Sequence, residues 1–290
     1  MHKNQRMIYF IYNPNAGNKS NRYRQKLINT LRKIPNTNLL LTEYPKHAEE
    51  IAQKLLLKQP KKIIAIGGDG TINEIGNVLK GTNIPMGIIP LGSGNGLARH
   101  LHIPMQVEKA IHIALNGKAN YIDVLSWNNR AFFCTAGIGF DAQVAALFHA
   151  GKGRGLVNYI KATFQALVIY SHTEISINQS DVQNLFSLTV ANANQFGNNA
   201  FISPLSNLQD ALFEIVKIKK GNLWQKVQLG ISLFSKVIHQ HPLVEIQQDK
   251  SIQIHCQVGD YYHLDGESNQ TQTNLIKIEI MQEKLMVIHS

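Results

Sequence analysis

The first 120 residues alternate short apolar runs with stretches whose apolar residues follow the period of a helix. Four of the short runs predict strands, at residues 7–12, 39–41, 63–66 and 86–89. Ala48 and Val107 each begin a stretch in which apolar residues recur at offsets of 0, 3, 4, 7 and 8, the spacing of one helix face. Helices are also predicted at 21–33 and 72–79. This alternation, with short loops, predicts a parallel sheet covered by helices on both faces.

The pattern changes at about Tyr121. Strand-like runs then follow one another at 131–135, 174–177, 185–190, 212–218, 243–246, 252–256 and 275–280, interrupted by helical stretches near 141–148, 156–170 and 223–238. Such a succession predicts a second domain built on mostly antiparallel sheet. A last strand at 285–288 is expected to return to the first domain. We therefore expect two domains, residues 1–122 with 283–290, and residues 123–282.

Composition adds a basic character to this picture. The 290 residues include 29 Lys and Arg against 19 Asp and Glu, a net charge of +10. That balance favours polyanionic partners such as nucleotide phosphates or an anionic lipid surface, with ordinary solvated faces as the alternative. No nucleic-acid-binding motif accompanies the basic residues, so we expect no nucleic-acid partner.

Two further features bear on the location of the protein. The sequence has no apolar run of about 18 residues, the length that a membrane-spanning helix needs. The apolar run near the N-terminus is too short for a signal-peptide core. Cys134 and Cys256 are expected to be buried thiols in a reducing cytoplasm, with a disulfide as the alternative. The expected location is the cytoplasm, with peripheral contact to the inner membrane face as a further option.

The most informative motif follows the predicted strand at 63–66. Residues 67–71 read Gly-Gly-Asp-Gly-Thr and lead directly into a helix. Glycines let the backbone adopt positive φ and approach a ligand, and the N-terminus of a helix attracts phosphate. Asp69 would be repelled by bare phosphate, so its expected role is to bind a Mg²⁺ ion that bridges phosphates. A tight turn in which Asp69 or Thr71 caps the helix is the alternative.

Two more loops follow predicted strands and should reach the same ligand. Residues 92–96 read Gly-Ser-Gly-Asn-Gly, and residues 13–17 read Asn-Pro-Asn-Ala-Gly. Because the carboxyl ends of neighbouring parallel strands meet at one edge of a sheet, we expect the three loops to lie together. Considered alone, residues 13–17 have a plain Asn-Pro turn as the alternative interpretation.

The second domain contains a candidate for acid–base chemistry. Asp265 and Glu267 flank Gly266, immediately after the strand-like residues 261–263. One carboxylate could accept the proton of an attacking hydroxyl while the other stays near a metal ion. A simple Asp-Gly turn is an equally good interpretation of the same residues.

Taken in order, these motifs resemble the diacylglycerol kinase and sphingosine kinase superfamily, in particular its bacterial soluble lipid kinases. Residues 13–17 resemble the first nucleotide loop, with Ala16 at the position of the usual serine. The other matching segments are 67–74, 92–95, 137–142, which resembles the segment opening the second domain, and 265–267, which resembles the motif supplying the catalytic base. The resemblance implies a nucleotide domain like that of NAD kinases and a β-sandwich domain, with the active site in the cleft between them.

The loops and the resemblance together give a set of expected site residues. Nucleotide contacts are expected from Asn13, Pro14, Asn15, Ala16, Gly17, Thr42, Gly67, Gly68, Asp69, Gly70, Thr71, Asn73, Glu74, Gly92, Ser93, Gly94 and Asn95. Asp265 and Glu267 are the expected catalytic residues. The resemblance also implies a structural Mg²⁺ site at Asn207, Asp210 and Leu212, although Ala211 stands where the family usually has glycine. Asp69 is the expected metal ligand beside the nucleotide.

The predicted function is transfer of the γ-phosphate of ATP, with Mg²⁺, to a hydroxyl of a membrane lipid such as diacylglycerol or a sphingoid base. Two alternatives remain open, a soluble-substrate kinase of the NAD kinase type and a non-catalytic nucleotide- or lipid-binding regulator. Two segments are candidates for membrane contact, residues 151–155 with the apolar helix after them, and the helix carrying Leu223, Trp224, Val227, Ile231 and Phe234. Ordinary core helices are the alternative for both.

Overall fold

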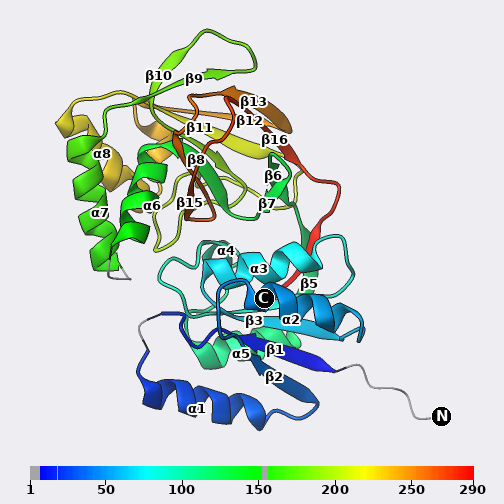
Figure 1. The fold of residues 1–290 in the computed structure, drawn as a ribbon. Helices are drawn as coiled ribbons and strands as arrows, with labels where there is room; N and C mark the ends of the chain where they lie inside the picture. The colour runs from blue at the N-terminus through cyan, green and yellow to red at the C-terminus, as the bar shows by residue number, and fades with distance from the viewer. Residues whose placement is uncertain (1–6, 18, 152–155) are drawn as a thin grey trace. The chain divides into compact units, whose positions relative to one another are not determined.

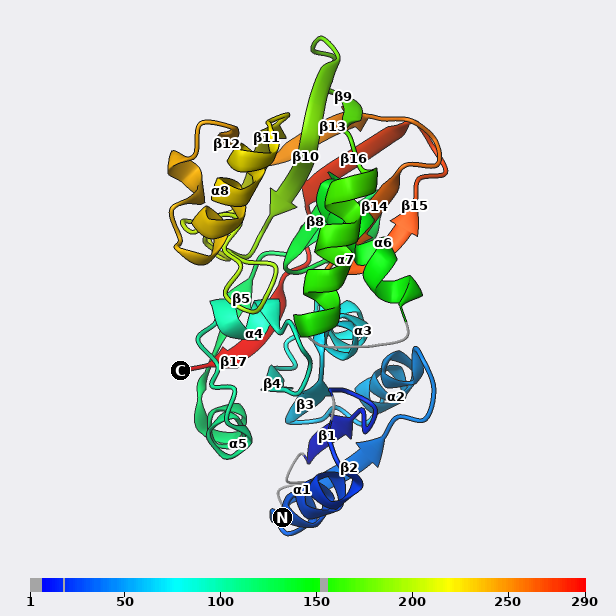
Figure 2. The same cartoon turned by 90° about the vertical axis from the view of Figure 1, so that its left-hand side faces the viewer.

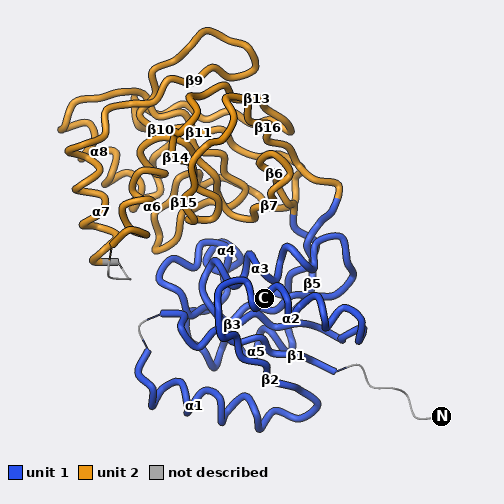
Figure 3. Tube along the Cα trace, viewed as in Figure 1, with its two compact units in different colours: residues 1–122, 283–290 blue, residues 123–282 orange. Residues whose placement is uncertain are grey.

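The structure is a computed structural model that describes residues 7–17, 19–151 and 156–290. Its chain divides into two compact units (Figure 3). Unit 1 comprises Met1–Ile122 and Glu283–Ser290, and unit 2 comprises Asp123–Gln282. The nucleotide-binding and lipid-substrate roles given to these stretches stay predictions.

Unit 1 is built on a six-stranded sheet in the order β2-β1-β3-β4-β17-β5. These strands are β1 (Ile8–Tyr12), β2 (Thr37–Leu41), β3 (Lys62–Gly67), β4 (Met86–Pro90), β5 (Lys118–Ile122) and β17 (Leu285–His289). Neighbouring strands pair in parallel, as predicted, except that β5 pairs antiparallel with β17. All of β3 and β4 is buried, which explains the unbroken apolar runs at residues 63–66 and 86–89.

Helices cover both faces of this sheet. They are α1 (Asn21–Arg32), α2 (His47–Leu56), α3 (Asp69–Leu79), α4 (Gly96–His100) and α5 (Val107–Asn116). Figures 1 and 2 show α2 and α3 on one face and α1 and α5 on the other. In α2, the residues that set the helical period are the ones that turn inward, since Ala48, Ile51 and Leu55 are all buried.

Unit 2 is built on an eleven-stranded antiparallel sheet that curls around its own core. Its strands are β6 (Leu125–Trp127), β7 (Arg130–Phe132), β8 (Thr135–Gly139), β9 (Thr173–Ile177), β10 (Gln183–Ala191), β11 (Phe213–Lys219), β12 (Val244–Asp249), β13 (Ser251–His255), β14 (Tyr261–Leu264), β15 (Glu267–Gln270) and β16 (Leu275–Ile280). The main path runs β15-β14-β8-β10-β9-β13-β16-β6-β7, and β11 and β12 branch from β10. Trp127 stacks on Tyr262 inside, with ring centroids 4.8 Å apart.

Three longer helices lie on unit 2, namely α6 (Phe140–Ala150), α7 (Leu156–Ile169) and α8 (Leu223–Phe234). Helix α8 begins with a capping box, in which Asn222 and Gln225 exchange side-chain-to-backbone hydrogen bonds. A second apolar cluster joins Leu229 of α8 and Leu167 of α7 to Phe186 and Ile218 of the sheet. The predicted fold class, a parallel α/β domain with a mostly antiparallel β domain, is therefore confirmed.

The burial of the two cysteines and the lengths of the helices agree with what the sequence predicts. Cys134 and Cys256 are both buried thiols that are not joined in a disulfide. Burial, with a smaller contribution from Asp260, raises the pKa of the Cys256 thiol to about 11, so this thiol stays protonated at neutral pH. In the part of the chain that the structure describes, no helix is long and apolar enough to cross a membrane.

Candidate functional site

The three glycine-containing loops of unit 1 all leave the carboxyl edge of its sheet. Residues 13–17 follow β1, residues 67–71 span the end of β3 and the first turn of α3, and residues 91–95 join β4 to α4. Because β1, β3 and β4 are adjacent and parallel, the three loops emerge side by side. This edge is where ligands bind in open α/β sheets.

Hydrogen bonds join the three loops to one another. The Asn13 side-chain amide donates to Thr71 Oγ1 at 3.2 Å, while Asn13 Oδ1 accepts from the Asn15 amide. The Asp69 carboxylate accepts from the backbone amides of Asn95 at 2.8 Å and Gly96 at 2.9 Å. The structure thus brings the predicted nucleotide residues of all three loops together.

Two of the glycines are required by close approach of backbone. A Cβ atom on Gly92 would lie 2.6 Å from Gly68 Cα and 2.8 Å from Asn95 Oδ1, so neither loop leaves room for a side chain. Gly17 has φ of +67°, and a Cβ there would lie 2.2 Å from the Leu91 carbonyl oxygen. The glycines therefore set the spacing between the loops, in addition to any approach to a ligand.

Three further residues predicted to contact the nucleotide, Thr42, Asn73 and Glu74, lie elsewhere in unit 1 and make different contacts. Thr42 is buried at the end of β2, and its amide donates to the Tyr12 carbonyl. Asn73 accepts from Asn77, one turn further along α3. Both carboxylate oxygens of Glu74 accept backbone amides at the start of α2, from Lys46 and Ala48. In this structure Glu74 caps α2, a role that sequence did not assign to it.

The residues predicted to bind metal lie in two separate places. Asp69 already accepts one backbone amide on each carboxylate oxygen. In the loop before β11, Asp210 Oδ1 accepts from the Leu212 amide and Asn207 Oδ1 from the Gln209 amide. Within the described ranges, no three His, Cys, Asp or Glu side chains cluster as a metal cage. Mg²⁺ commonly takes only one or two carboxylates and completes its shell with phosphate and water, so both metal sites stay predictions.

Ala211 in the same loop adopts a conformation that favours glycine. Its φ is +57°, and its amide donates to the fully buried Asp123 carboxylate at 2.9 Å. Asp123 is joined to the loop a second time, because its own amide donates to the Leu208 carbonyl. The left-handed backbone at this position explains why a glycine suits it. Ala211 adopts the same conformation at a cost of about 1 kcal/mol in folding free energy.

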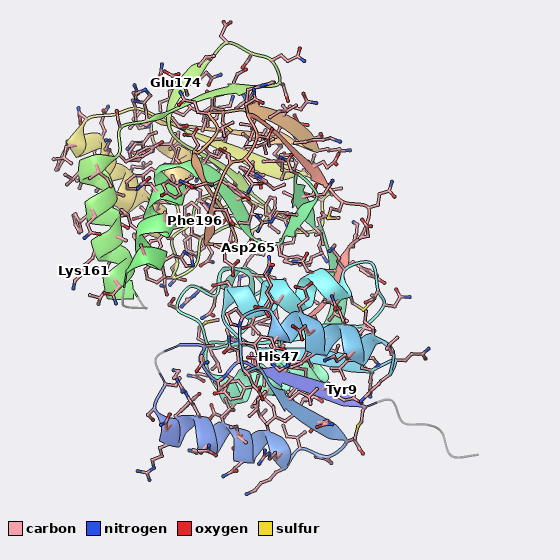
Figure 4. The ribbon with its side chains drawn as sticks, viewed as in Figure 1. Tyr9, His47, Lys161, Glu174, Phe196 and Asp265 are labelled. Carbon is pink, nitrogen blue, oxygen red and sulfur yellow. The ribbon has the colours of Figure 1, made fainter. Side chains whose placement is uncertain are left out.

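Asp265 and Gly266 form the two-residue turn between β14 and β15. Both have positive φ, +49° and +87°, and Leu264 pairs with Glu267 across the turn, as in a type I′ hairpin. The Asp265 carboxylate also accepts three backbone amides, from Phe133 at 3.0 Å, Cys134 at 2.7 Å and Thr135 at 3.2 Å. Asp265 is labelled in Figure 4. The Asp265 carboxylate is therefore held in one orientation. The backbone of the motif is an Asp-Gly turn, as one of the two interpretations of the sequence predicted.

Glu267 differs from Asp265 in its surroundings. It is exposed and opens β15. The structure thus holds the two predicted catalytic carboxylates differently, one fixed by backbone amides and one at the surface.

Unit 2 also holds a buried polar cluster that sequence did not reveal. Asp141, in the first turn of α6, accepts from Ser187 Oγ at 2.8 Å and Thr189 Oγ1 at 2.7 Å, and lies 3.1 Å from His263 Nε2. A Cβ on Gly137 would lie 2.2 Å from the Asp141 carboxylate, which accounts for the glycine there. The members come from α6, β10 and β14, so no local pattern could have grouped them.

His263 is the member of this cluster nearest the predicted base, two residues before Asp265 on the same hairpin. It is almost fully buried, and the ring of Phe196, labelled in Figure 4, packs edge-on against it at 5.9 Å. Its Nε2 faces Asp141, while Nδ1 has no hydrogen-bond partner among the described residues. A histidine held in this way by a carboxylate has a fixed ring orientation.

Replacement of Asp141 by Ala is expected to lower the free energy of unfolding by about 3–5 kcal/mol, because three side-chain donors and one amide lose a buried acceptor. Urea denaturation measures the change. Asp181, an exposed aspartate in the β9–β10 connection, is the matched control, and Asp181→Ala should change stability by less than about 0.5 kcal/mol. A loss below about 1 kcal/mol for Asp141→Ala would show that the cluster does not stabilise the unit.

Comparison with known protein families agrees with this division of the chain. The family model described as "Diacylglycerol kinase catalytic domain" matches residues 7–127. A second, described as "YegS C-terminal NAD kinase beta sandwich-like domain", matches residues 134–289. The two matches together account for nearly the whole described chain.

Individual relatives agree as well. A protein from Staphylococcus saprophyticus named diacylglycerol kinase is 30% identical over 275 residues, covering 89% of this chain and 87% of its own. A Bacillus subtilis protein of the same name is 29% identical, covering 89% and 88%. A crystal structure described as a diacylglycerol kinase from Bacillus anthracis superposes with a TM-score of 0.72 at 19% identity, over 98% of this chain and 97% of that one. This last likeness concerns the fold.

Proposed function

Because the chain belongs to the diacylglycerol kinase family, we propose that it is an ATP-dependent lipid kinase that phosphorylates a hydroxyl of a membrane lipid. The observation that carries the proposal is the set of hydrogen bonds joining three glycine loops at the carboxyl edge of the unit 1 sheet. Diacylglycerol is the first candidate acceptor because the relatives are named diacylglycerol kinase. A sphingoid base is the second candidate.

We propose that the loops hold the phosphates of ATP. The N-terminus of α3, which begins directly after Gly68, carries the positive end of the helix dipole, which attracts phosphate oxygens. Asp69 keeps the 67–71 and 92–95 loops at a fixed separation through its bonds to Asn95 and Gly96. A rigid cradle of this kind contributes by positioning and by charge neutralisation, which supply most of the acceleration in phosphoryl transfer.

Mg²⁺ fits the nucleotide end of this site. Asp69 is the only aspartate in the sequence of unit 1, and a carboxylate is the kind of ligand that Mg²⁺ prefers. Asp69 would hold the ion together with the phosphates, and the ion would neutralise phosphate charge. We also propose, on the resemblance alone, that Asn207, Asp210 and Leu212 hold a second, structural Mg²⁺.

We propose Asp265 as the group that accepts the proton of the lipid hydroxyl. Three backbone amides fix its carboxylate in one orientation, which is the requirement for a general base that must meet an incoming hydroxyl. Glu267, three positions after Leu264 on the other strand of the hairpin, is proposed as a supporting negative charge. Transfer requires the acceptor hydroxyl to lie in line with the terminal phosphate.

ATP consumption measured with diacylglycerol, a sphingoid base, ceramide and NAD in detergent micelles tests the proposal. Turnover that depends on one of the lipids supports it. Turnover only with NAD would identify a soluble-substrate kinase instead, an option to which the NAD kinase-like description of residues 134–289 lends weight. ATP binding without turnover on any acceptor would identify a regulator. We further propose a cytoplasmic location with peripheral contact to the membrane.

A further inference from the structure

Helix α8 is apolar on its outer side as well as on its inner side. Leu229 and Leu233 face the apolar cluster of the unit, as a core helix requires. Five other large apolar side chains are exposed, Leu223, Trp224, Val227, Ile231 and Phe234, and Trp224 is 68% exposed. Their offsets of 0, 1, 4, 8 and 11 place them on one face of the helix. The interpretation of α8 as an ordinary core helix is therefore wrong for this face.

Helix α7 repeats the arrangement. Ala162 and Ala166 are buried on its inner side, whereas Val157, Ile160, Phe164 and Val168 are exposed at offsets of 0, 3, 7 and 11. Phe164 is 65% and Val168 86% exposed. Lys161, labelled in Figure 4, is exposed between them. Residues 152–155, part of the other segment considered for membrane contact, lie outside the described residues.

The two helices lie on the same side of unit 2. Leu167 of α7 and Leu229 of α8 pack into the same apolar cluster, against Phe186. Both helices lie on the left-hand side of the unit in Figure 1 and face the viewer in Figure 2. We call the residues of these two exposed stripes the α7–α8 face: Val157, Ile160, Phe164, Val168, Leu223, Trp224, Val227, Ile231 and Phe234. Large exposed apolar residues gathered on one side of a unit mark an interaction site.

The segments that carry this face contain basic residues and no acidic ones. Helix α7 contains no Asp or Glu and one basic residue, Lys161. Residues 215–244 contain no Asp or Glu and five lysines, Lys217, Lys219, Lys220, Lys226 and Lys236. Glu245 pairs with Lys217 and Lys219, but among the described residues no salt bridge involves Lys161, Lys226 or Lys236. Two apolar helices whose only charged residues are lysines suit an anionic lipid surface, whereas two copies of this face would repel each other.

We propose that the α7–α8 face docks unit 2 onto an anionic lipid bilayer, with Trp224 and its apolar neighbours inserted at the level of the headgroups. The inference rests on the proposed lipid kinase function, because such an enzyme must take its acceptor from a membrane. Tryptophan favours the membrane interface, and lysines beside it contact the phosphates of the lipids. Docking of this kind buries apolar area and weakens as salt rises.

The protein carries its own probe for this proposal. It has two tryptophans, and Trp127 is 3% exposed in the core, so a change in emission on docking reports Trp224. Vesicles of phosphatidylglycerol and phosphatidylcholine should shift the emission to shorter wavelength and co-sediment with the full chain. Vesicles of phosphatidylcholine alone should do so at least about tenfold more weakly. No emission shift with the anionic vesicles would overturn the proposal.

Matched variants locate the docking surface. Val227→Asp with Ile231→Asp adds two negative charges to exposed positions of the face and should weaken vesicle partitioning at least about tenfold. Val182→Asp with Val258→Asp makes the same change at two valines that are equally exposed, 64% each, outside α7 and α8, and should have less than about a threefold effect. Equal weakening in both pairs would overturn the assignment.

Two further outcomes separate this inference from the proposed function. If the wild type is a dimer in analytical ultracentrifugation and the Val227→Asp, Ile231→Asp variant is a monomer, the face is a contact between copies and the proposal is wrong. Lipid phosphorylation in detergent micelles should be unchanged in that variant. Vesicle binding without any lipid turnover would support docking and reject the kinase function. Turnover in micelles without vesicle binding would support the kinase function and reject docking.

Discussion

Replacement of Asp265 by Asn is expected to lower lipid-dependent ATP turnover at least about 100-fold, while the affinity for ATP changes less than about twofold. The reason for the loss is that the amide cannot accept a proton from the lipid hydroxyl. ATP affinity is spared because every loop proposed to hold the phosphates lies in unit 1. Turnover in micelles and ATP binding by calorimetry measure the two quantities on the same preparation.

Asn is the informative substitution because it suits the turn. Asp265 stands at the first position of a type I′ hairpin, where Asn followed by Gly is strongly favoured. One oxygen remains to accept the Cys134 amide, so we expect a loss of about 1–3 kcal/mol in unfolding free energy rather than an unfolded protein. Asp260→Asn, which removes a carboxylate that accepts from Thr173 and Gln257 in the same unit, is the control and should keep turnover within about threefold.

The variant also separates the two interpretations of the motif. If Asp265 serves only as a turn residue that anchors the 133–135 segment, turnover should fall no further than the folded fraction falls. Residual turnover above a few per cent in a fully folded Asp265→Asn protein would therefore reject the base assignment. Glu267→Gln, at an exposed position, should have the smaller effect of the two.

The fold class could be predicted because burial leaves a periodic trace in the sequence. Residues 63–66 and 86–89 are unbroken apolar runs, and the structure buries β3 and β4 on both faces. Two elements of unit 1, β5 and α4, were not predicted because this periodic trace is missing from them. Strand β5 has four exposed residues out of five, and α4 is a five-residue helix, so neither has enough buried positions to show a period.

The candidate site was predictable only where it is local in sequence. The loops at 13–17, 67–71 and 92–95 are conspicuous because glycine and asparagine gather in them, and parallel strands bring such loops together. What the side chains bind could not be predicted. Asp69 bonds to Asn95 across 26 positions, and Glu74 bonds to Lys46 across 28. Such pairings depend on how strands are ordered in the sheet, which no spacing along the chain encodes.

Asp69→Ala is expected to weaken ATP binding at least about 30-fold both in Mg²⁺ and in EDTA, equivalent to about 2 kcal/mol of lost hydrogen bonding to a charged group. Without the carboxylate, the amides of Asn95 and Gly96 lose their acceptor and the two loops are no longer held at one separation. Calorimetric titration with ATP measures the change. Glu108→Gln, an exposed acid on α5 of the same unit, should bind ATP within about twofold of the wild type.

The metal dependence of this effect decides what Asp69 does. A residue that acts only as a Mg²⁺ ligand would leave ATP binding in EDTA unchanged when it is replaced, and that result would contradict the bridging role. Asp69→Asn refines the test, because its one amide oxygen can still accept from one of the two loop amides but brings no charge to a cation. If Asp69 bridges the loops, the Asp69→Asn variant should recover part of the ATP affinity in EDTA. If Asp69 both bridges the loops and binds Mg²⁺, that recovery should be smaller in Mg²⁺ than in EDTA. Equal losses for Ala and Asn under both conditions would mean that charge, and not the two hydrogen bonds, governs how these loops receive the nucleotide.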